Sequence, residues 1–186
     1  MTTNYEIKVW VGNLGKYNEG ELVGEWFTLP HNISDIMKTI GVADGTPYEE
    51  WEIFDYVMHP FVEINRHSSL ETLNELAELI QELTEEQLEI VTVLIQQNVL
   101  GNNKAEDVKR SIEIVQHGEG TDYNIVRGYH SYKELAESIA LDSGLISEDN
   151  PLYGYIDFEL YANKHLFLHT THYPVKDGVY VEWLHG

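Results

Sequence analysis

The sequence predicts an α+β fold: an elongated chain of three small modules. These are an N-terminal ββαβ module over residues 1–62, a helical module over residues 63–104, and a C-terminal mixed α/β module over residues 105–186. Apolar residues alternate with polar ones in the first stretch, recur at helical spacing in the second, and do both in the third. The 186 residues are 42% hydrophobic, which is enough apolar material for packed cores.

The first module is predicted from alternation and turn residues. Ile7, Val9 and Val11 fall on one face of a strand whose other face is polar. Glycines at 12, 15 and 20 indicate a loop after this strand. We expect strands over Glu6–Val11, Glu25–Leu29 and Trp51–Met58, and a helix that begins at Asn32 or Ser34 and ends near Ile40, before Gly41.

The second module is predicted to be a helical hairpin. Two pairs of residues have the spacing of a capping box: Ser68 with Glu71, and Thr84 with Gln87. In a capping box the first side chain accepts the backbone N–H of the second residue, and the second side chain accepts the backbone N–H of the first. An apolar helical pattern follows each pair, and the hairpin is expected to end near Gly101.

The third module mixes both periodicities. Gly118 and Gly120 indicate a loop, and Asp142-Ser143-Gly144 is a helix stop. We expect a short helix over Ala105–Ser111, a strand over Glu113–Gln116, a helix from the capping pair Ser131 and Glu134 to Leu141, and strands over Leu166–Thr170 and Val179–Trp183.

The charge is the most unusual quantity. The chain has 32 Asp and Glu against 11 Lys and Arg, a net of −21, and the three predicted modules contribute −7, −6 and −8. So large an excess disfavours binding to DNA phosphates or anionic lipid and favours a basic partner.

The helix after Ser69 shows the excess most clearly. Glu71, Glu75, Glu78 and Glu82 recur at spacings of three and four, so they share one face, and no Lys or Arg lies between Arg66 and Lys104. An ordinary solvated face is an alternative for one such helix, although ordinary faces interleave both signs of charge. The acids expected to form a partner-binding surface are Glu49, Glu50, Asp55, Glu71, Glu75, Glu78, Glu82, Glu86 and Glu89.

The sequence gives no support to a catalytic or cofactor site. His165, His169 and His172 would share a face on a helix, but Phe167, Thr170, Thr171 and Tyr173 predict a strand and loop, where the three do not converge on a metal. The segment Gly12–Lys16 lacks P-loop spacing, and no G-x-S-x-G motif occurs. We expect no enzyme activity, no cofactor and no metal.

The absence of cysteine excludes disulfides, thiolate catalysis and cysteine-based zinc sites. The first ten residues lack the features of a signal peptide, and no apolar run approaches the ~20 residues of a membrane span. A soluble, cytoplasmic protein is therefore expected.

Two motifs resemble a known family. The run Asn13-Leu14-Gly15-Lys16-Tyr17-Asn18-Glu19-Gly20-Glu21-Leu22-Val23-Gly24, with Trp26 and Leu29-Pro30 after it, resembles the N-terminal signature of the ArdA antirestriction proteins. Tyr155-Ile156-Asp157-Phe158-Glu159 followed by Tyr161 resembles that family's antirestriction motif. Order, spacing and length agree over essentially the whole chain.

The resemblance implies a function. Members of the family are carried on conjugative plasmids or transposons, are elongated, and mimic bent B-form DNA. It implies inhibition of type I restriction–modification enzymes by direct competition with DNA at the methyltransferase core, without direct binding to nucleic acid.

The resemblance also implies a homodimer formed through the C-terminal module, near the antirestriction motif. The residues assigned to this motif and interface are Tyr153, Tyr155, Ile156, Asp157, Phe158, Glu159 and Tyr161. Family motifs continue with a small residue and an Arg-Asp pair, whereas this chain has Ala162-Asn163-Lys164, so its ion pairing there must differ.

One alternative belongs to another class. An acidic inhibitor or adaptor of a different basic nucleic-acid-binding protein would have the same net charge. The sequence does not identify which restriction enzymes are inhibited, nor a preference for restriction over modification.

Overall fold

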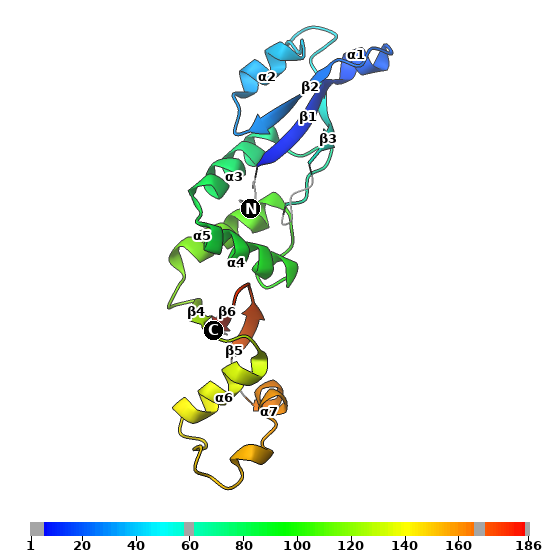
Figure 1. The fold of residues 1–186 in the computed structure, drawn as a ribbon. Helices are drawn as coiled ribbons and strands as arrows, with labels where there is room; N and C mark the ends of the chain where they lie inside the picture. The colour runs from blue at the N-terminus through cyan, green and yellow to red at the C-terminus, as the bar shows by residue number, and fades with distance from the viewer. Residues whose placement is uncertain (1–5, 58–61, 166–169, 185–186) are drawn as a thin grey trace. The chain divides into compact units, whose positions relative to one another are not determined.

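The computed structural model describes residues 6–57, 62–165 and 170–184 (Figure 1). It confirms an α+β fold, with helices and two three-stranded antiparallel sheets in the described residues. The chain forms two compact units, Met1–Ile112 and Glu113–Gly186, each containing one sheet. The three modules divided at residues 62 and 104 remain a prediction.

The sheet of the first unit has the order β2-β1-β3. Its strands are β1 (Ile7–Asn13), β2 (Gly24–Leu29) and β3 (Trp51–Tyr56), in agreement with the predicted alternation. Ile7, Val9 and Val11 are fully buried on one face. Helix α2 (Ile33–Thr39) follows β2, and the Asn32 side chain accepts the Asp35 backbone N–H, so Asn32 rather than Ser34 is its N-cap.

The expected loop after β1 is wrong in part, because α1 (Leu14–Asn18) occupies it. The Asn13 side chain accepts the Lys16 backbone N–H and donates to the carbonyl oxygens of Ile40 and Gly41. A buried asparagine thus caps the helix and joins it to the end of α2. Asn13 and its partner Ile40 are 27 residues apart in the sequence, so the local sequence pattern does not reveal this contact.

The helical hairpin is confirmed as α3 (Leu70–Glu82) and α4 (Glu85–Gln96). The Thr84–Gln87 capping box forms in both directions. The first box is wrong by one residue: Ser69 accepts the Thr72 backbone N–H, and Ser68 instead accepts the Asn65 backbone N–H. Only Ser68 has a glutamate three residues later, but the turn before the helix uses Ser68, so Ser69 caps the helix without a reciprocal partner at Thr72.

The strand expected over Glu113–Gln116 is wrong. Helix α5 (Ala105–His117) continues through it, and the division between the two units falls within this helix. Val108, Ile112 and Val115 recur at helical spacing and are buried, so their tertiary contacts outweigh the strand preference of β-branched residues.

The first strand of the second unit is β4 (Tyr123–Arg127), which the sequence did not predict. The expected capped helix is α6 (Tyr132–Asp142), with Ser131 as its N-cap. Strands β5 (Thr170–Pro174) and β6 (Val179–Leu184) complete a sheet of order β4-β6-β5. The strand expected over Leu166–Thr170 falls mostly outside the described residues.

Residues 152–165, which we call the antirestriction segment after the motif that they resemble, fold into the 3-10 turn η1 (Tyr153–Tyr155) and helix α7 (Phe158–His165). Ala136 and Ala140 of α6 pack with Phe158 and Ala162 of α7, and all four are buried. Small alanines on both helices let their backbones approach closely, and Phe158 fills the space between them.

Candidate partner-binding surface

The outer face of α3 carries a row of four carboxylates, which we call the acid row: Glu71, Glu75, Glu78 and Glu82. At 3.6 residues per turn they fall within an arc of about 60° around the helix axis, roughly 4.5–6 Å apart along it. All four residues are exposed, while the opposite face of α3 is buried. The predicted row is therefore present on the surface of the first unit.

Packing and hydrogen bonds fix the acid row to the first sheet. The buried side of α3 includes Leu70, Leu73, Leu76, Ala77 and Ile80. The Asn74 side-chain amide donates to the His31 carbonyl oxygen at 2.7 Å, and its oxygen accepts the His31 backbone N–H at 3.0 Å. His31 directly follows β2 and Pro30, so this pair of bonds joins the helix to the end of that strand.

The acid row is only partly neutralised. Lys109 of α5 forms an ion pair with Glu75, a contact that the gap in basic residues between 66 and 104 did not reveal. Ser69 donates its hydroxyl hydrogen to Glu71 at 2.8 Å. Over residues 6–57, 62–165 and 170–184, Glu78 and Glu82 have no ion pair with a basic side chain.

The other acids expected on this surface differ in exposure. Glu49, Glu50 and Asp55 are exposed, whereas Glu86 and Glu89 of α4 are half-buried. Glu49 accepts the Gly45 backbone N–H, and Asp55 accepts the Tyr56 backbone N–H, so both also order their local turns. The sequence prediction omitted Glu85, which is exposed in the first turn of α4.

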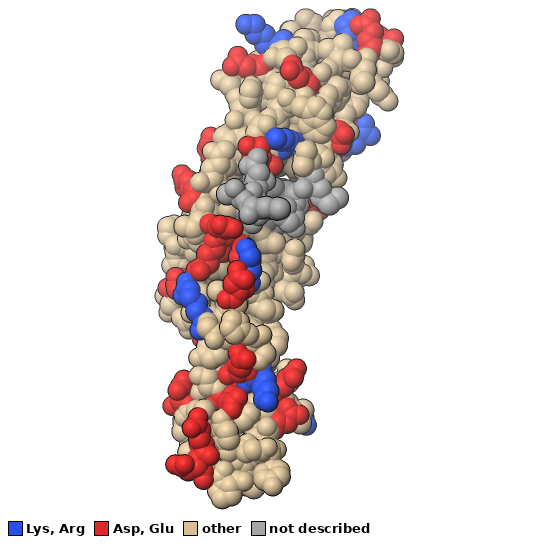
Figure 2. Space-filling view, viewed as in Figure 1, with Lys and Arg blue, Asp and Glu red and all other residues tan. Residues whose placement is uncertain are grey.

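Several cations of the first unit are already paired with its own acids. Lys8 pairs with Glu6 at 2.9 Å, and Lys16 pairs with Glu19 and Glu21 at 3.3 and 3.4 Å. Arg66 binds Glu52, a half-buried acid that the prediction did not include. Acidic side chains are visible on both units in Figure 2, with basic ones beside them at several places.

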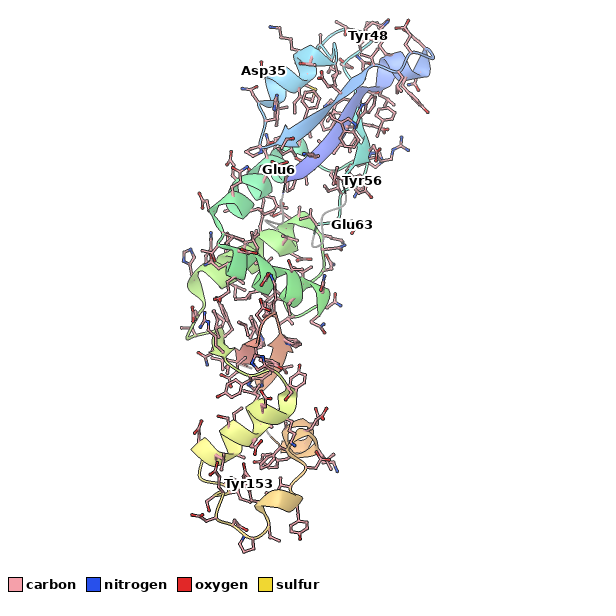
Figure 3. All side chains as sticks on the ribbon, in the orientation of Figure 1. Glu6, Asp35, Tyr48, Tyr56, Glu63 and Tyr153 are labelled. Atoms are coloured by element: carbon pink, nitrogen blue, oxygen red, sulfur yellow. The ribbon has the colours of Figure 1, made fainter. Side chains whose placement is uncertain are left out.

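The antirestriction segment has an inner and an outer side. On the inner side, Phe158 is buried and the Tyr153 hydroxyl donates to Glu137 of α6. Tyr153 is labelled in Figure 3. The hydrogen bond to this carboxylate, with desolvation, raises the pKa of Tyr153 to about 12. Asp157 accepts the Leu160 backbone N–H at 2.9 Å and so caps α7, which makes it a structural acid.

On the outer side the segment exposes apolar groups. Tyr155 is 88% exposed, Leu152 65% and Leu160 49%. Glu159 is exposed, Ile156 and Tyr161 are half-buried, and Asn163 and Lys164 are exposed where the resembling motif has an Arg-Asp pair. The motif residues thus divide into a packed set and a solvent-facing set.

A family model described as antirestriction protein (ArdA) matches residues 9–181. The chain belongs to the ArdA antirestriction protein family. The match spans both sheets, the acid row and the antirestriction segment, so it covers nearly all of the structure described above. A search of curated proteins found no match.

Membership has two general consequences. ArdA proteins are inhibitors rather than enzymes, and the family implies interaction with restriction enzymes. None of the described helices is long and apolar enough to cross a membrane.

Of the three histidines considered as metal ligands, His172 has a described side chain. His165 ends α7, His169 lies outside the described residues, and His172 is buried in β5. Desolvation lowers the pKa of His172, partly offset by Glu182, whose oxygen lies 3.5 Å from its Nε2. No group of three potential metal ligands occurs among the described residues.

Proposed function

We propose that this ArdA protein is a DNA mimic that occupies the DNA-binding cleft of type I restriction–modification enzymes, at their methyltransferase core. The observation behind the proposal is the acid row on α3: four exposed carboxylates on one helical face, with Asn74 bonded to the first sheet. The protein has no catalytic role in this proposal and acts in the cytoplasm.

The physical basis is the spacing and fixation of negative charge. Each strand of B-DNA carries one phosphate per about 3.4 Å of axis, and the acid row has one carboxylate per roughly 4.5–6 Å. Arginine and lysine side chains that normally bind phosphates form the same kind of charge-assisted hydrogen bond with carboxylates. Arginine often forms two such bonds with one carboxylate. Because the acids are already held in place, little conformational entropy is lost on binding.

The same charge supports two further parts of the proposal. A protein of net −21 repels nucleic acid, so the contact is with the enzyme and not with its DNA substrate. Phosphate contacts carry no base sequence, so a mimic of them inhibits enzymes that have different recognition sequences.

We further propose that the protein is a homodimer, joined through the outer side of the antirestriction segment. Leu152, Tyr155 and Leu160 expose apolar area there. Burying such groups against a second copy removes apolar surface from water, and a two-fold interface brings the same patch from both chains together. The acids of this segment lie at the rim in this arrangement.

A competition experiment tests the function. A type I methyltransferase bound to a labelled cognate duplex is titrated with this protein, and DNA release is followed by fluorescence anisotropy at several salt concentrations. The affinity of this protein for the enzyme, corrected for the enzyme's affinity for the duplex at the same salt, should fall steeply as salt rises, because the contact is mainly ionic. Failure to displace DNA at low salt would contradict the proposal, as would an affinity that does not depend on salt.

The dimer is tested separately by light scattering on the wild-type protein and on Tyr155→Ser. The wild type should have twice the mass of one chain. The variant should dissociate into monomers at a higher protein concentration than the wild type does. A monomeric wild type at micromolar concentration would refute the homodimer and leave the inhibition test unaffected.

A further inference from the structure

The N-terminal signature also builds a surface that the acid row does not use. Its residues form α1 and the start of β2, and Tyr17 and Trp26 project onto the side of the first sheet opposite its buried face. We propose that this side, the aromatic face of Trp10, Tyr17, Trp26 and Phe54, is a second docking surface that receives arginine side chains of the same enzyme. The inference rests on the proposed function.

The four rings share one side of the sheet. Trp10 and Trp26 are directly opposite in the antiparallel pair of β1 and β2, so their side chains project to the same face. The ring centroids of Trp10 and Phe54 are 5.5 Å apart at 89°, and those of Tyr17 and Phe54 are 5.0 Å apart at 62°. The rings therefore form a connected, edge-to-face cluster.

The rings of Trp10 and Phe54 pack directly against the backbone at Gly12, and the Trp10 ring also packs against Gly24. A Cβ atom at Gly12 would come within 2.6 Å of both the Trp10 and the Phe54 ring, and one at Gly24 within 2.4 Å of the Trp10 ring. Glycine is required at these positions by the close approach of the rings. The orientation of Trp10 and Phe54 is consequently fixed before any partner binds.

The aromatic face stays open to water in the unit that contains it. Trp26 is 47% exposed and Tyr17 52%, whereas the opposite face of the same sheet is buried under α2 and α3. Exposed aromatic groups gathered on one surface are typical of interaction sites, because a chain that binds no partner is more stable when such groups are buried in its own core.

Charge identifies the occupant. The first unit has 20 acidic and 7 basic side chains, a net of −13. Lys8 is already paired with Glu6, Lys16 with Glu19 and Glu21, and Arg66 with Glu52. Asp55, opposite Trp10, is exposed. A guanidinium group stacks flat on a ring while it hydrogen-bonds a carboxylate, so arginine fits both features, whereas an anion would be repelled.

The test replaces Trp26, which lies on an edge strand and is partly exposed. Trp26→Phe retains an aromatic ring, and Trp26→Leu retains apolar area without one. In the competition against DNA, we expect Trp26→Phe to stay close to the wild type and Trp26→Leu to bind about 3- to 30-fold more weakly. The loss should be the same at each salt concentration, because a short-range ring contact is poorly screened.

The outcomes separate the two proposals. If the wild type fails to displace DNA, the proposed function and this inference both fail. If Trp26→Leu binds like the wild type, the aromatic face is not a contact. If Trp26→Leu and Trp26→Phe bind equally and more weakly than the wild type, the contact depends on the size of tryptophan alone and arginine stacking is refuted.

Fluorescence gives a second measurement that does not depend on the folding of a variant. Acrylamide should quench the wild-type tryptophan emission less in the complex than in the free protein, and this protection should be smaller in Trp26→Phe, which retains Trp10 of the aromatic face. Equal quenching of the wild type, free and bound, would overturn the inference.

Discussion

Helices α3 and α6 both begin at a serine N-cap and both carry several acids, yet they use those acids differently. On α6, Glu134 accepts the His130 backbone N–H, Glu137 accepts the Tyr153 hydroxyl, and Asp142 accepts the Ser138 hydroxyl. On α3, Glu78 and Glu82 form no ion pair with a basic side chain in the described part of the chain. Net charge alone does not separate structural acids from acids available to a partner.

The two helices also differ in energetic terms. Each hydrogen-bonded acid on α6 offsets its desolvation with a donor from its own unit. The acid row instead places like charges at spacings of three and four, which destabilises a helix by roughly 0.2–0.5 kcal/mol per pair. A feature that lowers stability and remains on the surface is better explained by binding than by folding.

The largest effect is expected from the acid row as a whole. Replacing Glu71, Glu75, Glu78 and Glu82 by glutamine should weaken DNA displacement on the order of 100-fold, because several partner cations lose their ionic contacts together. The free energy of unfolding should change little, because the relief of like-charge repulsion offsets the loss of the Lys109–Glu75 ion pair and the weakening of the Ser69–Glu71 hydrogen bond. Affinity is measured by the competition titration, and stability by urea unfolding.

A matched control removes the same charge from exposed acids of the second unit: Glu113, Glu119, Glu148 and Asp149. This control should weaken displacement far less. Equal losses for both variants would mean that net charge, and not the position of the acid row, governs binding.

On α6 the corresponding effect is structural and depends on pH. The pKa of Tyr153 is raised from 10.0 to about 12, chiefly by its hydrogen bond to Glu137. Because the folded pKa is the higher one, the stabilisation is fully present below pH 10 and is lost as the pH rises through about 12. Tyrosine ionisation followed by ultraviolet absorbance should show a late step from Tyr153, beside the late ionisations of Tyr132 and Tyr180, whose pKa is also raised by burial.

Two variants assign that step. Tyr153→Phe should remove it, and Glu137→Gln should shift it towards the ordinary tyrosine pKa. DNA displacement by Glu137→Gln should remain that of the wild type; a loss comparable to that of the acid-row variant would erase the distinction between the two helices.

A smaller effect is expected where α3 joins the sheet. Asn74→Ala removes two hydrogen bonds to the His31 backbone, so the free energy of unfolding should fall by about 1–2 kcal/mol. Gln81→Ala, an exposed position on the same helix, is the control and should change stability by less than about 0.5 kcal/mol. Equal values in urea unfolding would show that the Asn74 bonds contribute nothing.

The smallest effect is expected from a single acid. Glu78→Gln should weaken DNA displacement by less than about 5-fold, because exposed ionic contacts each contribute roughly 0.2–1 kcal/mol. A loss as large as that of the quadruple variant would indicate one dominant contact instead of an extended one.

Local pattern was sufficient for most elements. Alternation predicted β1, β2 and β3, and capping pairs predicted α4 and α6, because side-chain period and end-capping are properties of neighbouring residues. The acid row was predictable for the same reason: spacing along a helix fixes which residues share a face. Net charge and the absence of cysteine needed no structure at all.

Tertiary contacts decided the rest. The Asn13 cap on α1 depends on residues far along the chain, and the burial of Val115 keeps α5 helical where local preference favours a strand. The pairing of Lys109 with Glu75, the bond from Tyr153 to Glu137 and the aromatic face each join residues from separate elements. Such contacts exist only after the chain has folded, so the sequence determined which acids are present, and the fold determined which remain open to a partner.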